Sequence, residues 1–199
     1  MMYLSAYRLS RTDSRHLRLT DCYSVHRVVY DLFDPVRSEG EQTHSGILYV
    51  DKGEDRQERL VLILSNRLPK TPAYGKVETR TLERSHLDFS TYRFEIVVNP
   101  VRRNNQTRKI VPVRGRAAIA RWFMNKAPAW GFAVPELSLQ VAEITVDRFK
   151  AKEAVTLGKA RLTGMLHVTD RQRFVQSVCQ GIGRGRAFGC GLLQIVPCA

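Results

Sequence analysis

A histidine and a tyrosine, three residues apart in the stretch CYSVHRVVYDLF that begins at Cys22, could together transfer a proton. The apolar residues of this stretch recur at i, i+3, i+4 and i+7, which predicts an amphipathic helix that buries Val25, Val28, Val29 and Leu32. At about 100° per residue, Tyr23 and His26 share a flank just beyond that buried face. An imidazole and a phenol at the edge of a core, followed by Arg27, suit proton transfer on an anionic substrate. The plainer interpretation is a histidine that only packs, and it stays open at this point.

The charge of the chain indicates which anion to expect. The 199 residues hold 32 Lys and Arg against 19 Asp and Glu, a formal net charge of +13. The basic residues are segregated, with eight between positions 96 and 135, four from position 171 to the end, and no acid in either segment. Such segregation favours nucleic acid as the partner over an evenly solvated surface. RNA would suit the proposed groups, because its 2′-hydroxyl lies beside the scissile phosphate, and a base, an acid and cations suffice without a metal.

A glycine-rich segment, QGIGRGRAFGCGLL at positions 180–193, is the second unusual feature. It holds five glycines together with Arg184 and Arg186. Exposed main-chain N–H groups in such loops can approach a phosphate closely. The segment lacks the GxxxxGK[ST] pattern, and it follows an expected helix and precedes an expected strand, which is the reverse of a nucleotide-binding order. A helix C-cap followed by a turn is the alternative interpretation.

Cysteine usage and hydropathy exclude several classes. The four cysteines form no CxxC pair and have no histidine at zinc-ligand spacing, so we expect reduced thiols and no metal site. No run of about 18 apolar residues predicts a membrane span, and the first residues lack the order of a secretory signal. These features favour a cytoplasmic protein.

The first half of the chain predicts strands around one helix. We expect strands at residues 2–9, 46–53 and 59–67. The helix that begins after its N-cap Asp21 lies between the first two of these strands. This order opens a split βαβ unit. The two prolines and the glycine of residues 68–76 predict a loop, and residues 77–89 are compatible with either a strand or a helix.

The second half repeats that order. Strands are expected at 91–100, 137–151, 155–168 and 191–197, and helices at 115–126 and after Asp170, with a basic hairpin around Asn104 and Asn105. The fold class is therefore α+β, with two tandem ferredoxin-like (RRM-like) βαββαβ domains at 1–88 and 90–199. The first domain carries the helix with His26, and the second carries the hairpin and the glycine-rich segment. No RNP-like aromatic run stands on a central strand, which argues against base stacking on the sheet.

Three blocks of the sequence resemble a known family. GIGRGRAFGCGLL near the C-terminus resembles the signature of the CRISPR repeat-processing endoribonucleases. YSVHR on the first helix and FEIVVNPVRR before the basic hairpin resemble the type I-E branch, the CasE family. The order of the blocks and their distances from the termini agree, so the resemblance spans nearly the whole chain.

The resemblance implies a specific reaction. Members of that family bind the stem-loop of each repeat in a precursor transcript and cut once at the 3′ base of the stem to give guide RNAs. The reaction needs no metal or other cofactor, and it leaves a 2′,3′-cyclic phosphate and a 5′-hydroxyl. The enzyme commonly stays on its product and joins the other subunits of the CRISPR surveillance complex.

The resemblance also implies roles for particular residues. His26 matches the catalytic histidine, and Tyr23 matches a tyrosine used by some members. The segment that engages the RNA stem corresponds to Arg102, Arg103, Arg108, Lys109 and Arg114. The region lining the cleavage groove corresponds to Arg148, Lys150, Lys152 and Lys159. The resemblance makes the glycine-rich loop partly structural. Its Arg184 and Arg186 are expected to contact RNA, as is Arg27 on the helix. The structural glycines of the loop are Gly181, Gly183, Gly185, Gly189 and Gly191.

Two rival interpretations explain part of the pattern. A non-catalytic RNA-binding subunit of a ribonucleoprotein shares every basic feature, and only Tyr23 and His26 argue against it. A DNA- or ribosome-associated structural protein explains the charge but not the glycine-rich segment.

Overall fold

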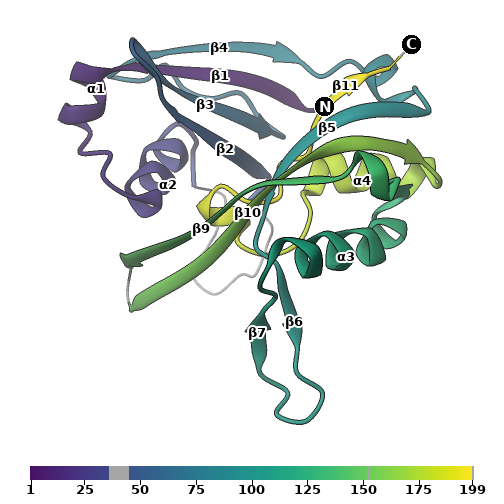
Figure 1. Ribbon diagram of the computed structural model, residues 1–199. Helices are drawn as coiled ribbons and strands as arrows, with labels where there is room; N and C mark the ends of the chain where they lie inside the picture. The colour runs from purple at the N-terminus through teal and green to yellow at the C-terminus, as the bar shows by residue number, and fades with distance from the viewer. Residues whose placement is uncertain (36–44, 152, 199) are drawn as a thin grey trace. The chain divides into compact units, whose positions relative to one another are not determined.

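The computed structural model of the chain describes residues 1–35, 45–151 and 153–198 (Figure 1). The chain divides into two compact units. The first consists of Met1–Leu82 together with Ala187–Gly189, and the second of Glu83–Arg186 together with Cys190–Ala199. The sequence predicts a boundary between residues 88 and 90. It gives no indication that three residues of the glycine-rich segment belong to the first unit, as they do in the structure.

The first unit is built on a four-stranded antiparallel sheet. The strand order is β2-β3-β1-β4, and the strands are β1 (Tyr3–Ser10), β2 (Ile47–Glu54), β3 (Glu58–Ser65) and β4 (Lys76–Thr81). In β1, alternate residues such as Tyr7 and Leu9 are buried while their neighbours are not, as expected when one face of a sheet is covered. This strand order is that of a ferredoxin-like fold.

Two helices follow β1 in the first unit, α1 (Arg11–His16) and α2 (Cys22–Asp31). The core joins α2 to the sheet, because Val25 and Val29 pack in one cluster with Tyr7, Tyr49 and Ile63. The valine stripe thus faces the strands, which confirms the amphipathic helix expected after Asp21. Helix α1 was not expected, although Ser10 and Asp13 form a reciprocal capping box at its start.

The connection from β3 to β4 departs from the βαββαβ pattern. Residues 66–75 contain no helix, and Pro69, Pro72 and Gly75 explain why, since each disfavours a continuous helical turn there. The segment 77–89, whose sequence is compatible with either a strand or a helix, contains parts of both. It supplies most of β4 and then, in the second unit, the short 3₁₀ helix η1 (Arg84–Leu87).

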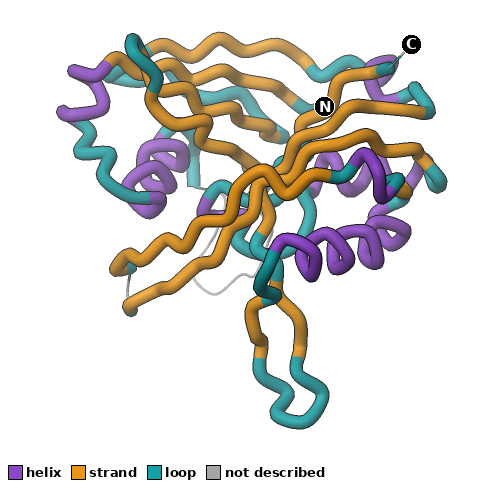
Figure 2. The backbone as a smooth tube through the Cα atoms, viewed as in Figure 1, coloured by secondary structure: helices purple, strands orange, loops and turns teal. Residues whose placement is uncertain are grey.

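The second unit has the complete ferredoxin-like order. Its antiparallel sheet has the order β11-β5-β10, and both β9 and β8 pair with the remaining edge of β10. Two helices, α3 (Arg116–Lys126) and α4 (Arg171–Gln180), lie on one face of this sheet (Figure 2). The strands are β5 (Thr91–Val98), β8 (Phe132–Ala133), β9 (Gln140–Lys150), β10 (Ala154–Val168) and β11 (Gln194–Pro197). Two short 3₁₀ helices flank β8, namely η2 (Ala127–Trp130) and η3 (Glu136–Ser138).

Aromatic side chains fill the core of the second unit. Phe123 on α3 stacks on Phe94 of β5 with ring centroids 5.7 Å apart. Phe174 on α4 lies 5.2 Å from Tyr92 and meets Phe132 edge to face. Offset and edge-to-face pairs of this kind stabilise a core beyond the area that they bury. Each of the two helices is therefore held against the sheet by aromatic contacts.

Three bulk expectations can be compared with the structure. None of the four cysteines forms a disulfide, Cys190 is buried, and the other three are partly buried. Among the helices of the described residues, none combines the length and the apolar character needed to cross a membrane. Within the same residues, no three His, Cys, Asp or Glu side chains gather in a way that could hold a metal ion.

Candidate active site

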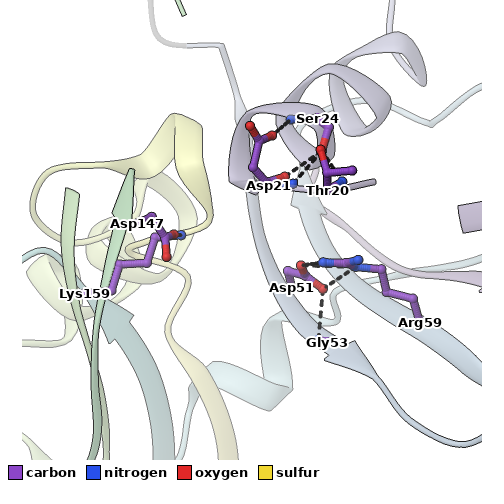
Figure 3. Close-up of polar contacts among 8 residues, drawn as sticks. All are labelled: Thr20, Asp21, Ser24, Asp51, Gly53, Arg59, Asp147 and Lys159. Carbon is purple, nitrogen blue, oxygen red and sulfur yellow. Dashed lines mark hydrogen bonds and ion pairs between the residues drawn. The ribbon is translucent and has the colours of Figure 1, made fainter. Parts of the chain in front are cut away.

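The N-terminus of α2 is fixed by a reciprocal capping box (Figure 3). The Asp21 carboxylate accepts from the Ser24 backbone N–H at 2.7 Å, and the Ser24 hydroxyl oxygen accepts from the Asp21 N–H at 3.0 Å. The Thr20 N–H donates to the same hydroxyl at 3.0 Å. Such caps stabilise a helix by about 1 kcal/mol. The first turn, which carries Tyr23, is therefore held in a defined geometry.

His26 lies within an aromatic cluster on the flank of α2. Its ring centroid is 4.2 Å from that of Tyr30, 5.6 Å from Phe188 and 6.0 Å from Tyr23, onto which it stacks. The Tyr30 hydroxyl donates to Ser45 at 3.0 Å. His26 is partly buried and Arg27 is exposed. The sequence-derived placement of Tyr23 and His26 on one flank, at the edge of the core, thus agrees with the structure.

One hydrogen bond determines which nitrogen of His26 carries the proton. The His26 Nδ1 atom lies 2.7 Å from the carbonyl oxygen of Ala187, within the same unit. A carbonyl oxygen can only accept, so Nδ1 must carry the hydrogen. In the neutral ring, Nε2 is then the nitrogen with the lone pair. His26 is held in the tautomer that a general base requires at Nε2.

The charge state of His26 suits the same role. Burial lowers the pKa of His26 below its ordinary value of 6.5, and the Ala187 carbonyl and the Asp31 carboxylate oppose this shift only in part. The imidazole is therefore predominantly neutral at pH 7. A neutral ring with a defined acceptor nitrogen can take a proton from a hydroxyl group without first losing one to solvent.

The glycine-rich segment shapes the backbone that meets His26. All five of its glycines have positive φ, between 72° and 86°. At Gly191 a side chain would collide with the Ile182 carbonyl, 2.5 Å from an ideal Cβ, so glycine is required there. The Gly191 N–H donates to the Val97 carbonyl at 2.7 Å, and the Ile182 N–H donates to the Gly191 carbonyl at 2.9 Å. The segment is thus a hydrogen-bonded loop with defined geometry.

The basic hairpin is a two-stranded ribbon, β6 (Val101–Arg103) and β7 (Ile110–Pro112), that extends away from the sheet of its unit (Figure 1). The Asn104 side chain accepts from the backbone N–H groups of Gln106 and Thr107, which closes the turn. Arg102 and Arg103 are adjacent on one strand, so their side chains leave opposite faces. The basic residues expected to engage RNA here are all exposed: Arg102, Arg103, Arg108, Lys109 and Arg114.

Three of the four groove candidates lie in the described residues, and they divide between two faces of β9 and β10. Arg148 and Lys150 are exposed and share one face of β9, because they are two residues apart. Lys159 lies on the opposite face of the ribbon, where it forms an ion pair with Asp147 at 2.7 Å and is only 14% exposed (Figure 3). Lys152 lies outside the residues that the structure describes. The structure therefore brings together only Arg148 and Lys150.

The two arginines of the glycine-rich segment differ in their surroundings. The guanidinium of Arg186 donates to the Gln180 carbonyl at 2.7 Å, which ties the loop to the end of α4. Arg184 is exposed, and its backbone forms an isolated bridge with Asn99 at the end of β5. Arg186 thus has a structural contact within the loop, whereas the side chain of Arg184 is exposed. Both remain candidates for RNA contact.

Part of the histidine site has no signal in the sequence. The missed groups are Tyr49, Phe188 and the Ala187 carbonyl. Ala187 and Tyr49 are 138 positions apart in the chain and joined by a hydrogen bond of 2.9 Å. A backbone carbonyl has no residue-type signature, so only the folded chain reveals it. The aromatic residues Tyr49 and Phe188 carry no spacing that points to His26.

The fold and these groups define a class of protein. Both units expose arginines, which suits a polyanionic partner such as RNA. The first unit also holds a neutral histidine beside a tyrosine, which suits acid–base chemistry. The family of CRISPR associated proteins matches residues 2–197, and the chain belongs to that family.

Individual relatives agree with this membership. The chain is 28% identical to the CRISPR-associated endoribonuclease Cse3 of Thermus thermophilus over 116 residues, which is 53% of this chain and 55% of that protein. This match therefore spans about half the length of Cse3. The chain is 25% identical to the CRISPR system Cascade subunit CasE of Escherichia coli over 210 aligned positions, which cover 98% of this chain and all of that protein.

Solved structures confirm the fold. Cse3 of Thermus thermophilus, bound to an RNA that represents a pre-cleavage complex, superimposes with a TM-score of 0.82 at 22% identity, covering 98% of this chain and 99% of that one. Cas6e of Escherichia coli gives a TM-score of 0.67 at 21% identity, covering 98% and 100%. The expected ferredoxin-like α+β architecture is therefore confirmed. The family match and the relatives named Cse3 and CasE confirm the resemblance to the CasE family.

Proposed function

We propose that this protein is an endoribonuclease that cuts CRISPR precursor transcripts at the 3′ base of the repeat hairpin. The observation that carries the proposal is the hydrogen bond between His26 Nδ1 and the Ala187 carbonyl, which leaves a neutral imidazole with Nε2 as its basic nitrogen. The family membership supports it, as do relatives named as a CRISPR-associated endoribonuclease and a Cascade subunit.

The reaction is an in-line attack within the RNA. His26 Nε2 removes the proton of the 2′-hydroxyl, and the 2′-oxygen forms a bond to the adjacent phosphorus. The bond from phosphorus to the 5′-oxygen of the next nucleotide breaks, and that oxygen takes up a proton. The products are a 2′,3′-cyclic phosphate and a 5′-hydroxyl. We assign the cationic stabilisation of the pentacovalent transition state to basic side chains, with Arg27 as the neighbour of His26 in sequence.

Tyr23 is the second catalytic candidate, because its ring stacks on His26 on the same flank of α2. Its phenol either holds the 2′-hydroxyl or protonates the leaving oxygen. Removing the phenol in Tyr23→Phe preserves the ring stack, so we expect a cleavage rate about 10- to 100-fold lower with unchanged RNA affinity. Single-turnover cleavage and filter binding measure the two quantities. A Tyr23→Phe enzyme as fast as wild type would remove Tyr23 from the mechanism.

We assign substrate binding to the exposed basic residues of the hairpin and of β9. After cleavage, the protein remains on its product and joins the other subunits of a CRISPR surveillance complex in the cytoplasm. The name of its relative CasE, a Cascade subunit, supports this assembly. So does a TM-score of 0.69 to a chain of a CRISPR RNA-guided surveillance complex, at 20% identity.

One incubation separates this proposal from a binding module. The purified protein is mixed with the repeat RNA of its own genome in EDTA, and the products are resolved on a denaturing gel. We expect one cut at the 3′ base of the stem, a cyclic-phosphate end on the 5′ fragment, and no cut in a repeat whose stem is disrupted by mismatches. Tight binding without any cut would instead support the non-catalytic RNA-binding subunit.

A further inference from the structure

The Ala187 carbonyl accepts two hydrogen bonds from two elements of the first unit, α2 and β2. The His26 Nδ1–H donates to it at 2.7 Å, and the Tyr49 hydroxyl donates to it at 2.9 Å. Tyr49 lies on β2 and is only 1% exposed. A carbonyl oxygen has two lone pairs, so both bonds can form at once. The position of this oxygen is therefore determined by a buried phenol as well as by the imidazole.

The ring of Tyr49 also supports the backbone that carries this carbonyl. At Gly189, an ideal Cβ would lie 3.3 Å from Tyr49 Cε2, and the residue has a φ of +81°. Glycine thus lets the backbone approach the face of Tyr49 closely. The ring of Phe188, the residue just before Gly189, packs 5.6 Å from that of His26. Ala187–Gly189 is held between Tyr49 and His26.

We infer that Tyr49 is a positioning residue, whose hydroxyl fixes the Ala187 carbonyl so that His26 keeps its proton on Nδ1 and directs Nε2 to the substrate. The inference deepens the proposed function and rests on it for the catalytic consequence. Tyr49 does not touch the RNA in this mechanism. Partners of this kind orient histidines in many catalytic and metal sites by fixing the hydrogen bond at the second ring nitrogen.

Tyr7 provides a matched control for Tyr49. It is 2% exposed, lies in the same core cluster, and donates its hydroxyl to a backbone carbonyl, that of Tyr74, at 2.8 Å. The substitutions Tyr7→Phe and Tyr49→Phe each remove one buried hydroxyl that bonds to a main-chain oxygen. Only the second removes a donor from the carbonyl that His26 contacts.

The first measurement is the tautomer of His26 in the RNA-free protein. Long-range ¹H–¹⁵N correlation spectra of ¹⁵N-histidine protein report which ring nitrogen carries the proton, and a His26→Gln sample assigns the signal. We expect the Nδ1–H form in wild type and in Tyr7→Phe, and a mixture of both tautomers in Tyr49→Phe. The inference is overturned if Tyr49→Phe keeps the wild-type signal, or if Tyr7→Phe changes it equally.

The second measurement is the cleavage rate. Loss of one neutral hydrogen bond predicts a single-turnover rate about 3- to 12-fold lower for Tyr49→Phe, with the RNA dissociation constant within about 2-fold of wild type. If wild type cleaves no RNA, the proposed function fails while the tautomer spectra still decide the role of Tyr49.

If Tyr49→Phe does not fold, Gly189→Ala displaces the same backbone from the Tyr49 ring and should produce the same mixture of tautomers. An unchanged signal in Gly189→Ala overturns the inference.

Discussion

The His26→Ala enzyme is expected to cleave the repeat hairpin about 10²- to 10⁴-fold more slowly than wild type, with RNA affinity within a few-fold of it. The substitution removes the group that takes the 2′-hydroxyl proton but leaves the exposed arginines and lysines in place. Single-turnover cleavage in EDTA and equilibrium binding to an uncut RNA measure the two effects separately. Cleavage that survives the substitution would refute the role of His26.

His16→Ala is the matched control for this substitution. The Nδ1 atom of His16 lies 3.0 Å from the backbone carbonyl of Thr12, so this histidine also contacts a main-chain oxygen. It differs from His26 in that it is exposed and stacks on Tyr74. We expect His16→Ala to cleave at the wild-type rate. A comparable loss in both variants would indicate a general effect of removing a histidine from this unit.

The pH dependence of cleavage provides a second signature of His26. A general base works in its neutral form, and burial holds the pKa of His26 below 6.5. The rate should therefore rise as the pH increases through that pKa and become level above it. The residual activity of His26→Ala should lack this rise.

The second large effect is expected from the basic hairpin. Replacing four of its exposed basic residues by alanine should weaken binding of the repeat RNA about 100-fold near 0.15 M salt. If each contacts one phosphate, the slope of log K against log salt should become shallower by roughly 3 to 4 units. Binding isotherms between 0.05 and about 0.4 M salt test this. The four residues are Arg102, Arg103, Arg108 and Lys109.

A second set of four substitutions controls for the loss of net charge. It removes four other exposed arginines. Because each variant loses four positive charges, the formal net charge falls from +13 to +9 in both. We expect this control to change affinity only a few-fold and to leave most of the salt slope. Equal losses in the two variants would mean that the hairpin is not the RNA contact. The control residues are Arg56, Arg80, Arg93 and Arg121.

Local signals account for most of what the sequence predicted. Asp21 specifies the start of α2 and the valine stripe specifies its buried face. Both signals are local, because a cap and a helical period each depend on residues close together in the sequence. The hairpin is likewise specified by Asn104, whose side chain closes the turn. Tyr23 and His26 could therefore be placed on one flank before the fold was seen.

Features that depend on distant residues were not predictable in the same way. The carbonyl of Ala187 meets His26 across 161 positions of the chain, and the ion pair of Lys159 with Asp147 depends on the register of β9 and β10. Helix α1 was not predicted for another reason. Ser10 and Asp13 are a local capping signal, but the helix has only six residues, which are too few to show a helical period of apolar residues.

The central claim is that a neutral His26 removes the proton of a 2′-hydroxyl, and one substrate tests it most directly. The cut site of the repeat RNA is mapped, and the nucleotide 5′ to the scissile phosphate is replaced by its 2′-deoxy form. In EDTA, we expect wild-type protein to bind this RNA as tightly as the all-ribose RNA and to leave it uncut, while the all-ribose RNA yields a 2′,3′-cyclic phosphate. Cutting of the deoxy substrate at the same phosphate would contradict the mechanism.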